Sequence, residues 1–329
     1  MPGATRSAAA DSQDALLSSQ TGCVVDSGGP RRYGSLMPWF SYHGGHSGQF
    51  CRHAKGQLQA VVERAVEAGF THYGLSEHCP RYRKEDLLVG EEDLTPDDLL
   101  HTFEGYAQHA RELRERVRGK LDLLVGFETE RLPPDRWRER MGELRGRFKP
   151  DYIVGSVHDV DGLVIDYSPE GTRQVADAMG GKEALQLRYF DAVADLVKTL
   201  APEVVGHIDL IRKFDGPEPQ FSPTVRRRID VALEAVRSVS GVLEVNCATH
   251  RRGLGPVYPL VSILERARSM GIGVTLGDDS HGAHDVGVGL DASLRAIAAA
   301  GYSELHYLAK PGEQVEWKRA AIGDVRPHA

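Results

Sequence analysis

The sequence predicts an α/β protein whose parallel strands close into one barrel. From residue 39 onward, short β-like runs alternate with amphipathic helical stretches, which is the pattern of parallel βα units. With 329 residues, of which 41% are hydrophobic, the chain has enough apolar material for one large core. No repeat of fixed period appears, so solenoids and propellers fit poorly. We therefore expect a single domain.

The predicted elements follow one another in order along the chain. We expect strands at residues 39–42, 71–76, 121–127, 152–157, 204–207, 242–245 and 272–276, about seven in all. Apolar residues recur with helical spacing at residues 58–68, 96–117, 182–200, 223–239, 258–270 and 290–300, where we expect helices. A last β-like run covers residues 304–308.

The two ends of the chain differ in composition from the rest. Residues 1–36 are rich in Ala, Ser, Gly and Gln and have no apolar period, which predicts a flexible N-terminal extension. A transit peptide is the weaker interpretation, because Asp11, Asp14 and Asp26 are acidic where such peptides avoid acids. We assign residues 37–322 to the folded domain and residues 323–329 to a tail.

Charge and cysteine usage exclude several classes of protein. The net charge of −7 comes from 40 basic and 47 acidic residues spread along the sequence, so we expect neither nucleic acid nor a membrane as partner. The four cysteines, Cys23, Cys51, Cys79 and Cys247, have wide and irregular spacings, which indicates reduced thiols. Without an apolar run of membrane-spanning length or a secretory signal, the sequence predicts a cytoplasmic protein.

Polar side chains follow every predicted strand. Parallel barrels carry their functional groups on the loops after the carboxyl ends of the strands. The segments at these places are His43-Gly44-Gly45-His46 with His53, Glu77-His78, Gly126-Phe127-Glu128, Gly155-Ser156-Val157-His158, Gly206-His207-Ile208-Asp209, Glu244-Val245-Asn246 and Asp278-Asp279-Ser280-His281. Imidazole and carboxylate suit Zn, Mn or Fe, and several of them in one mouth would hold more than one ion.

Each of these residues taken alone is more often structural than functional. A single histidine is commonly a satisfied core or surface residue, and a single carboxylate is commonly a cap or loop residue. Here, however, seven of the 14 histidines follow a strand end. The other seven, for which we expect structural roles, are His72, His101, His109, His250, His284, His306 and His328; His250 and His284 are candidate exceptions because they flank the predicted mouth.

The motifs resemble those of the polymerase and histidinol phosphatase (PHP) family, specifically its monofunctional histidinol-phosphatase branch. The resemblance covers about residues 38–310 and rests on the strand-end segments above, together with Lys213-Phe214, Arg251-Arg252 and Tyr258-Pro259. It implies a distorted, TIM-like (β/α)7 barrel with a trinuclear metal centre, so we expect two to three divalent ions. The implied ligands are His43, His46, His53, His78, Glu128, His158, His207, Asp279 and His281.

One position departs from the family pattern. Family members usually open with His-x-His, whereas here two residues separate His43 from His46. Side chains alternate faces along a strand, so both rings face one side only if the chain bulges. The glycines Gly44 and Gly45 allow such a bulge.

The expected chemistry is metal-assisted hydrolysis of a phosphomonoester by activated water, with Asp279, His281 and His158 as catalytic residues. Neither a Gly-x-Ser-x-Gly elbow nor a phosphate-cradling loop is present. We expect Ser156, Lys213, Arg251 and Arg252 to contact phosphate. The resemblance implies L-histidinol phosphate as substrate, in histidine biosynthesis, and Asp159 and Asp166 are candidates to frame its cationic part.

Three alternatives remain open at this point. One is a related phosphoesterase acting on another small phosphate, a nucleotide or phosphotyrosine. A second, of another class, is a non-catalytic metal-binding or scaffolding domain, which would be expected to lack ligands. A third is an amidohydrolase, which would be expected to carry a bridging lysine at the end of a middle strand; no such lysine is visible. Oligomeric state and metal identity are not determined by these patterns.

Overall fold

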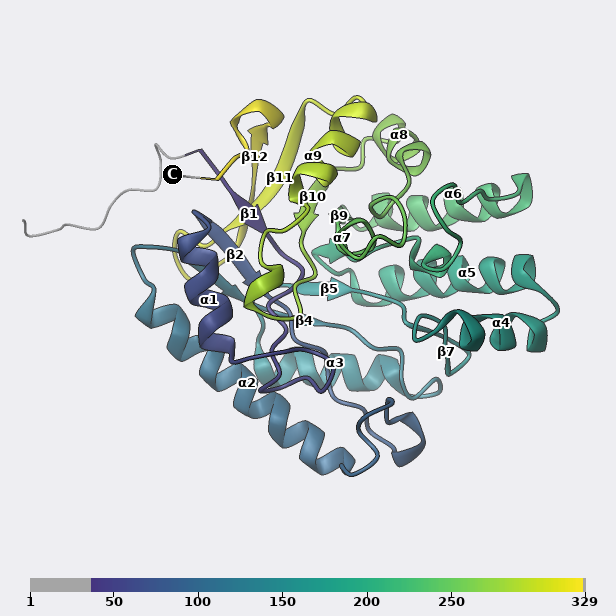
Figure 1. Cartoon of the computed structure of the whole chain (residues 1–329), viewed down its shortest axis with the longest axis horizontal. Helices are drawn as coiled ribbons and strands as arrows, with labels where there is room; N and C mark the ends of the chain where they lie inside the picture. Colours follow the sequence, from purple (N-terminus) through teal and green to yellow (C-terminus); the bar gives the residue numbers. More distant parts are fainter. Residues whose placement is uncertain (1–36, 328–329) are drawn as a thin grey trace, which may run out of the picture. The chain divides into compact units, whose positions relative to one another are not determined.

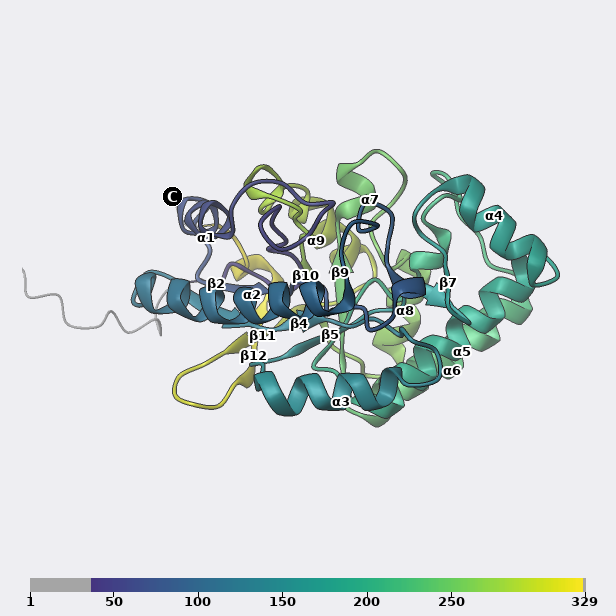
Figure 2. The same cartoon turned by 90° about the horizontal axis from the view of Figure 1, so that it is seen from below.

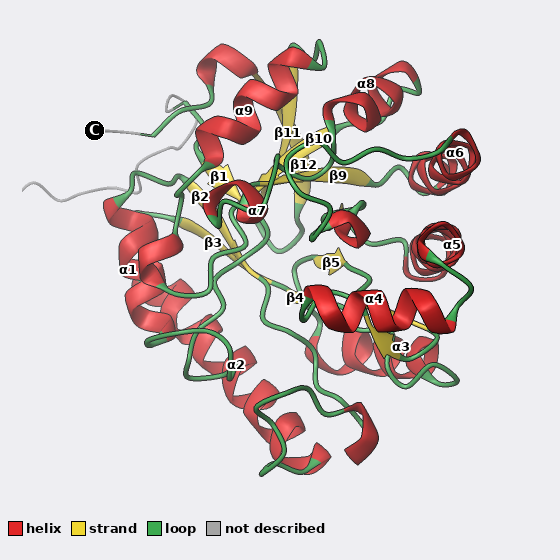
Figure 3. Cartoon of the chain, turned by 45° about the vertical axis from the view of Figure 1, so that its right-hand side comes forward, coloured by secondary structure: helices red, strands yellow, loops and turns green. Residues whose placement is uncertain are grey.

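The computed structural model describes residues 37–327, so the predicted N-terminal extension lies outside the described residues. Short strands occupy the middle of this part of the chain, and helices lie around them (Figures 1 and 3). The helices are α1 (Leu58–Glu67), α2 (Pro96–Arg116), α3 (Trp137–Phe148), α4 (Pro169–Ala178), α5 (Lys182–Leu200), α6 (Pro223–Ser238), α7 (Ala248–Arg251), α8 (Val261–Ser269) and α9 (Leu290–Ala299). None of the described helices is both long and apolar enough to cross a membrane.

The central strands are parallel and form two sheets. The first has the order β1 (Phe40–Ser41), β2 (His72–Leu75), β3 (Asp122–Val125), and the second has the order β10 (Val274–Gly277), β9 (Val242–Asn246), β8 (Val204–Val205), β5 (Ile153–Gly155), β4 (Phe127–Glu128). Backbone hydrogen bonds also link the two sheets: Tyr42 N donates to Leu276 O (3.0 Å), and Glu128 N donates to Glu77 O (3.0 Å). Parallel sheets covered by helices, as predicted, are therefore present.

Helix caps and apolar faces explain where the covering helices lie. Thr95 caps α2 by accepting from Asp98 N, and Ser222 caps α6 by accepting from Val225 N. Helices α5 and α6 pack against each other, as the view in Figure 2 shows. Their buried faces, which include Phe190 and Leu233, belong to one continuous apolar core with the strands.

Each of the seven predicted strands corresponds to an observed one, with β3 and β4 together replacing the strand predicted at 121–127. The predicted helix at 258–270 begins later, at Val261, because Tyr258 pairs with Asn246 through two backbone hydrogen bonds of 2.7 and 2.9 Å. The periodicity did not predict α3, α4 or α7.

The last β-like run is β11 (Glu304–Ala309), which pairs antiparallel with a strand that was not predicted, β12 (Glu316–Ala321). A second small hairpin joins β6 (Asp159–Val160) to β7 (Leu163–Val164). Short 3-10 turns lie at Lys84–Asp86, Leu210–Arg212, Ala283–Asp285 and Ile322–Asp324. Within the segment assigned as a tail, Val325 is buried, and residues 328 and 329 lie outside the described residues.

Candidate metal centre

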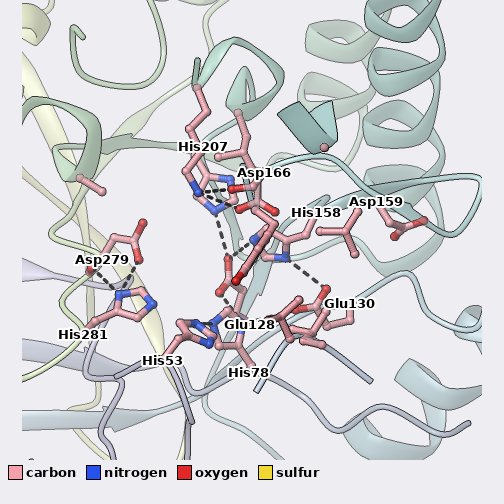
Figure 4. A pocket seen from close by; sticks show the side chains of 18 of the residues that line it. His53, His78, Glu128, Glu130, His158, Asp159, Asp166, His207, Asp279 and His281 are labelled. Atoms are coloured by element: carbon pink, nitrogen blue, oxygen red, sulfur yellow. Dashed lines mark hydrogen bonds and ion pairs between the residues drawn. The ribbon is translucent and has the colours of Figure 1, made fainter. Parts of the chain in front are cut away.

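The carboxyl ends of the central strands surround one cavity of about 600 Å³. Figure 4 shows the imidazoles of His53 and His78 next to each other, with Asp279 and His281 on one side and Glu130 on the other. The predicted residues that line the cavity are His53, His78, Glu128, His158, Asp159, Asp166, His207, Asp279, His281, Lys213 and Arg252. The side chains that the sequence places after separate strands therefore meet in one place.

Glu128, at the end of β4, is the centre of this cluster and is only 1% exposed. Its carboxylate oxygens lie 3.0 Å from His43 Nε2, 3.1 Å from His78 Nδ1, 3.1 Å from His207 Nε2 and 3.3 Å from His158 Nε2. Burial opposes ionisation, but the neighbouring imidazoles outweigh it and hold the pKa of Glu128 well below its ordinary value. One buried carboxylate thus faces four imidazoles, an arrangement suited to bridging cations.

The loop after β1 accommodates the additional residue between His43 and His46. Gly44 and Gly45 have φ values of +135° and +75°, which residues other than glycine rarely adopt. The N–H of Gly44 donates to Ser76 Oγ at 3.0 Å and holds the bulge in place. The two imidazole rings are 6.0 Å apart between centroids, and both belong to the cluster.

Buried carboxylates orient the first two histidines from behind. His46 Nδ1 lies 3.0 Å from Glu77 Oε1, and His43 Nδ1 lies 2.9 Å from Glu244 Oε2. An ionised carboxylate only accepts, so Nδ1 of each ring carries the proton and Nε2 is left for a ligand. His46 Nε2 is indeed buried without a hydrogen-bond partner.

The carboxylate of Glu130 lies next to two imidazoles. Its carboxylate lies 3.1 Å from His158 Nδ1 and 3.3 Å from His78 Nδ1. Burial opposes ionisation of Glu130, yet His158 and His78 together hold its pKa well below the ordinary value. On the opposite side, His281 Nδ1 donates to the carbonyl oxygen of Asp279 at 3.0 Å, which again leaves Nε2 free.

The sequence patterns predict no role for the carboxylates behind the rings. Glu77 and Glu244 lie within the strand-end segments, and Glu130 lies outside them. The signal was available, because Glu130 follows Glu128 by two residues and side chains two apart in extended chain share a face.

Metal ligand atoms gather in overlapping groups of three. Within each group, the nitrogen, oxygen or sulfur atoms all lie within 4.8 Å of one another. The groups are His46/His78/His281, Cys51/His53/His78, His43/His46/Asp279, His43/Glu128/His207 and His78/Glu130/His158. These imidazole-rich donor sets fit Zn, Mn or Fe, and the buried unpartnered nitrogens, His46 Nε2 and His207 Nδ1, fit cation binding better than a dry core.

Of the four predicted phosphate contacts, two line the cavity and two do not. Lys213 and Arg252 line the cavity, and Lys213 Nζ donates to Asp166 O at 2.6 Å and lies 3.0 Å from its Oδ2. Arg251 is not among the cavity-lining residues; its guanidinium donates to backbone carbonyl oxygens after β10. Ser156 is also not part of the cavity wall, and its Oγ is buried.

The described histidines with expected structural roles stay away from this cavity. His72, His101, His109, His250, His284 and His306 are not among its lining residues, and His328 lies outside the described residues. His250 and His284, the two candidate exceptions, are both exposed, on α7 and in the turn Ala283–Asp285.

Comparisons with known proteins agree with this arrangement. The model of the PHP domain family matches residues 43–248. A Schizosaccharomyces pombe protein named "Probable histidinol-phosphatase" is 36% identical over 271 residues, which are 80% of this chain and 88% of the relative. The histidinol-phosphatase of Saccharomyces cerevisiae is 25% identical over 293 residues, covering 78% of this chain and 87% of that protein.

Two solved structures have the same fold. HisK of Listeria monocytogenes superposes with a TM-score of 0.67 at 25% identity, covering 77% of this chain and 98% of that one. The histidinol phosphate phosphatase HisK of Lactococcus lactis, solved with Zn, L-histidinol and phosphate, gives a TM-score of 0.64 at 20% identity and covers 86% of this chain and 100% of that one. The family match covers most of the chain and includes strand-end residues from β1 to β9, so this protein belongs to the PHP domain family.

Proposed function

We propose that this protein is a metal-dependent phosphatase that hydrolyses L-histidinol phosphate to L-histidinol and phosphate, a step of histidine biosynthesis. The observation that carries the proposal is the convergence of imidazoles on Glu128 at the base of one cavity. Relatives named histidinol-phosphatase, similar over most of their length, support the same substrate. Every ligand position expected for the family carries a metal-binding side chain here, which disfavours the non-catalytic alternative.

We assign the nine predicted residues as ligands of two to three divalent ions. They are His43, His46, His53, His78, Glu128, His158, His207, Asp279 and His281, and each belongs to at least one group of clustered ligand atoms. Of these, His158, Asp279 and His281 are proposed to be essential for turnover. Divalent ions at this place supply positive charge for the phosphoryl oxygens and lower the pKa of bound water.

Other side chains orient the proposed ligands and line the cavity. Glu77, Glu130 and Glu244 fix the protonated nitrogen of the imidazoles they touch, so the second nitrogen faces the centre. Lys213 and Arg252 bring cationic donors to the cavity wall, where they suit the non-reacting phosphate oxygens.

The cavity also fits the other end of the substrate. Histidinol phosphate carries an ammonium group as well as a phosphate, and the carboxylates of Asp159 and Asp166 line the same cavity as Lys213. Tyr258 and Leu210 add apolar surface for a ring. The volume of about 600 Å³ is ample for a small phosphorylated metabolite.

The proposal also covers the architecture of the domain and the cellular compartment of the protein. We propose that residues 37–322 form one phosphoesterase domain, and that its two sheets close into a distorted seven-stranded barrel. The hydrogen bond from Tyr42 N to Leu276 O supports closure. The free, buried thiols of Cys51, Cys79 and Cys247 support a reducing compartment, the cytoplasm.

The test is phosphate release from L-histidinol phosphate by as-purified, chelated and Zn- or Mn-reconstituted protein, beside a panel of other phosphomonoesters. We expect strong preference for histidinol phosphate, loss of turnover on chelation, and loss in His158→Ala but not in the matched variant His109→Ala on α2. Metal binding without turnover of any phosphomonoester would refute the phosphatase assignment. Equal turnover of the whole panel would refute the substrate assignment.

A further inference from the structure

Cys51 lies beside the candidate metal centre but outside the nine ligands assigned above. It sits in the loop after β1, where its N–H donates to Ser47 O at 2.8 Å and its carbonyl oxygen accepts from Ala54 N at 3.2 Å. The residue is 8% exposed, and Sγ faces the imidazole of His53. The backbone therefore holds the thiol in place, and the centre has a sulfur at its edge.

The distances around this sulfur match those of ligands that share one ion. Sγ lies 3.4 Å from His53 Nε2, and His53 Nε2 lies 3.2 Å from His78 Nε2. In tetrahedral zinc, bonds of about 2.3 Å to sulfur and about 2.0–2.1 Å to nitrogen separate neighbouring ligand atoms by about 3.6 Å for S···N and about 3.3 Å for N···N. Both separations therefore agree within a few tenths of an ångström.

A small cavity and an unpartnered nitrogen both lie next to His78. A small cavity of about 20 Å³ is lined by Cys51, His53, His78 and Glu77, among others, which is room for one water-sized particle. His46 Nε2 is buried without a hydrogen-bond partner, on a wholly buried ring stacked 4.5 Å from that of His78.

The other described cysteines are engaged elsewhere. Cys79 Sγ accepts from the N–H of Glu130 at 3.1 Å, and Cys247 Sγ donates to Val288 O at 3.2 Å. Neither has an imidazole nitrogen among its recorded partners. Cys247 thus offers a matched control.

We propose that Cys51 is a thiolate ligand of the ion held by His53 and His78, an inference that rests on the metal centre of the proposed function. On binding, the S–H bond breaks, a sulfur–metal bond forms, and the proton passes to solvent. Thiolate is a soft ligand and prefers zinc to manganese. Cys51 therefore biases this position toward zinc, a preference that the imidazole and carboxylate ligands do not impose.

Cobalt substitution tests the assignment without relying on activity. Full-length protein is stripped with a chelator and titrated with Co(II). We expect visible d–d bands together with a near-ultraviolet sulfur-to-cobalt charge-transfer band. Cys51→Ser should lose the charge-transfer band and keep the d–d bands, while Cys247→Ser should keep both. Zinc and manganese affinities are then measured by competition with a chelator. At the weakest-binding of the ion sites, Cys51→Ser should lower the affinity for zinc by at least about tenfold, and the affinity for manganese by less.

The outcomes separate this inference from the proposed function. Wild-type protein with d–d bands but no sulfur band would overturn the role of Cys51 and leave the metal centre standing. Failure to bind cobalt at all would overturn both. If Cys51→Ser does not fold, zinc-edge X-ray absorption of the wild-type protein decides: a zinc–sulfur shell at about 2.3 Å supports the assignment, and only nitrogen and oxygen neighbours contradict it.

Discussion

Replacing Glu130 by glutamine removes the acceptor behind two imidazoles while keeping the shape of the side chain. Glu130 is 3% exposed and lies 3.1 Å from His158 Nδ1 and 3.3 Å from His78 Nδ1. The carboxylate offers two acceptor oxygens, whereas the amide offers one acceptor and one donor. In Glu130→Gln, one ring nitrogen that donated to an oxygen therefore faces an N–H group, and at least one of the two imidazoles loses its orientation.

The size of the effect follows from the number of rings involved. Loss of an outer carboxylate behind one metal-binding histidine costs about 10–100-fold in metal affinity or activity. Because Glu130 touches two rings, we expect kcat/KM to fall by about 100-fold, which corresponds to about 2.7 kcal/mol of transition-state stabilisation.

The assay is steady-state phosphate release from histidinol phosphate, with metal content per chain measured on the same preparations. Glu170→Gln is the control, since Glu170 is an exposed carboxylate on α4 that pairs with Arg173 at the surface. Catalysis and metal content indistinguishable from wild type in Glu130→Gln would refute the positioning role of Glu130. A loss of activity restored by excess zinc would assign the effect to metal affinity.

Further predictions concern the cavity wall, the strands and one buried histidine. Arg252→Gln should raise KM by about tenfold or more, because a cavity-lining cation is lost. Arg251→Gln should instead lower the free energy of unfolding by about 2 kcal/mol, measured by denaturant titration, because its guanidinium bonds backbone carbonyls behind the site. Gly277→Ala should destabilise the fold by about 1–3 kcal/mol, seen as a lower melting temperature, since its Cβ would lie 1.7 Å from Glu244 Oε1; an unchanged melting temperature would contradict this packing. Burial lowers the pKa of His72 from 6.5 to about 4. The unfolded chain therefore takes up the proton first, and about 3 kcal/mol of stability should be lost as pH falls from about 6.5 to about 4. His72→Gln should remove this part of the pH dependence, and an unaltered stability profile would count against it.

The strands that carry the site could be predicted from the sequence because they are short apolar runs that end in polar residues. Parallel strands end at the same edge, so order along the chain was enough to predict that His78, Glu128 and His207 meet. The extra residue before His46 could be interpreted as a bulge because two glycines occupy it. In the structure, both rings belong to groups of clustered ligand atoms, and both glycines have positive φ.

Weak periodicity explains the elements that were missed. Helix α3 has the sequence WRERMGELRGRF, in which only Trp137, Met141 and Leu144 are buried, so its apolar stripe is narrow. Strand β12 is largely exposed and lacks a continuous apolar face. It forms because β11 supplies a hydrogen-bonding edge.

The sequence by itself determined the α/β class with parallel strands, the order of the strands along the chain and the set of imidazoles and carboxylates that follow them, because these depend on local periodicity and on the rule that parallel strands share one end. Tertiary structure alone decided which carboxylate stands behind which ring, that Arg252 and Lys213 reach the cavity while Arg251 turns to the backbone, and that Cys51 faces His53. Except for Cys51 and His53, which are two residues apart in one loop, these contacts join residues distant in the chain. Their distances are set by how strands and loops pack, and no spacing along one strand encodes them.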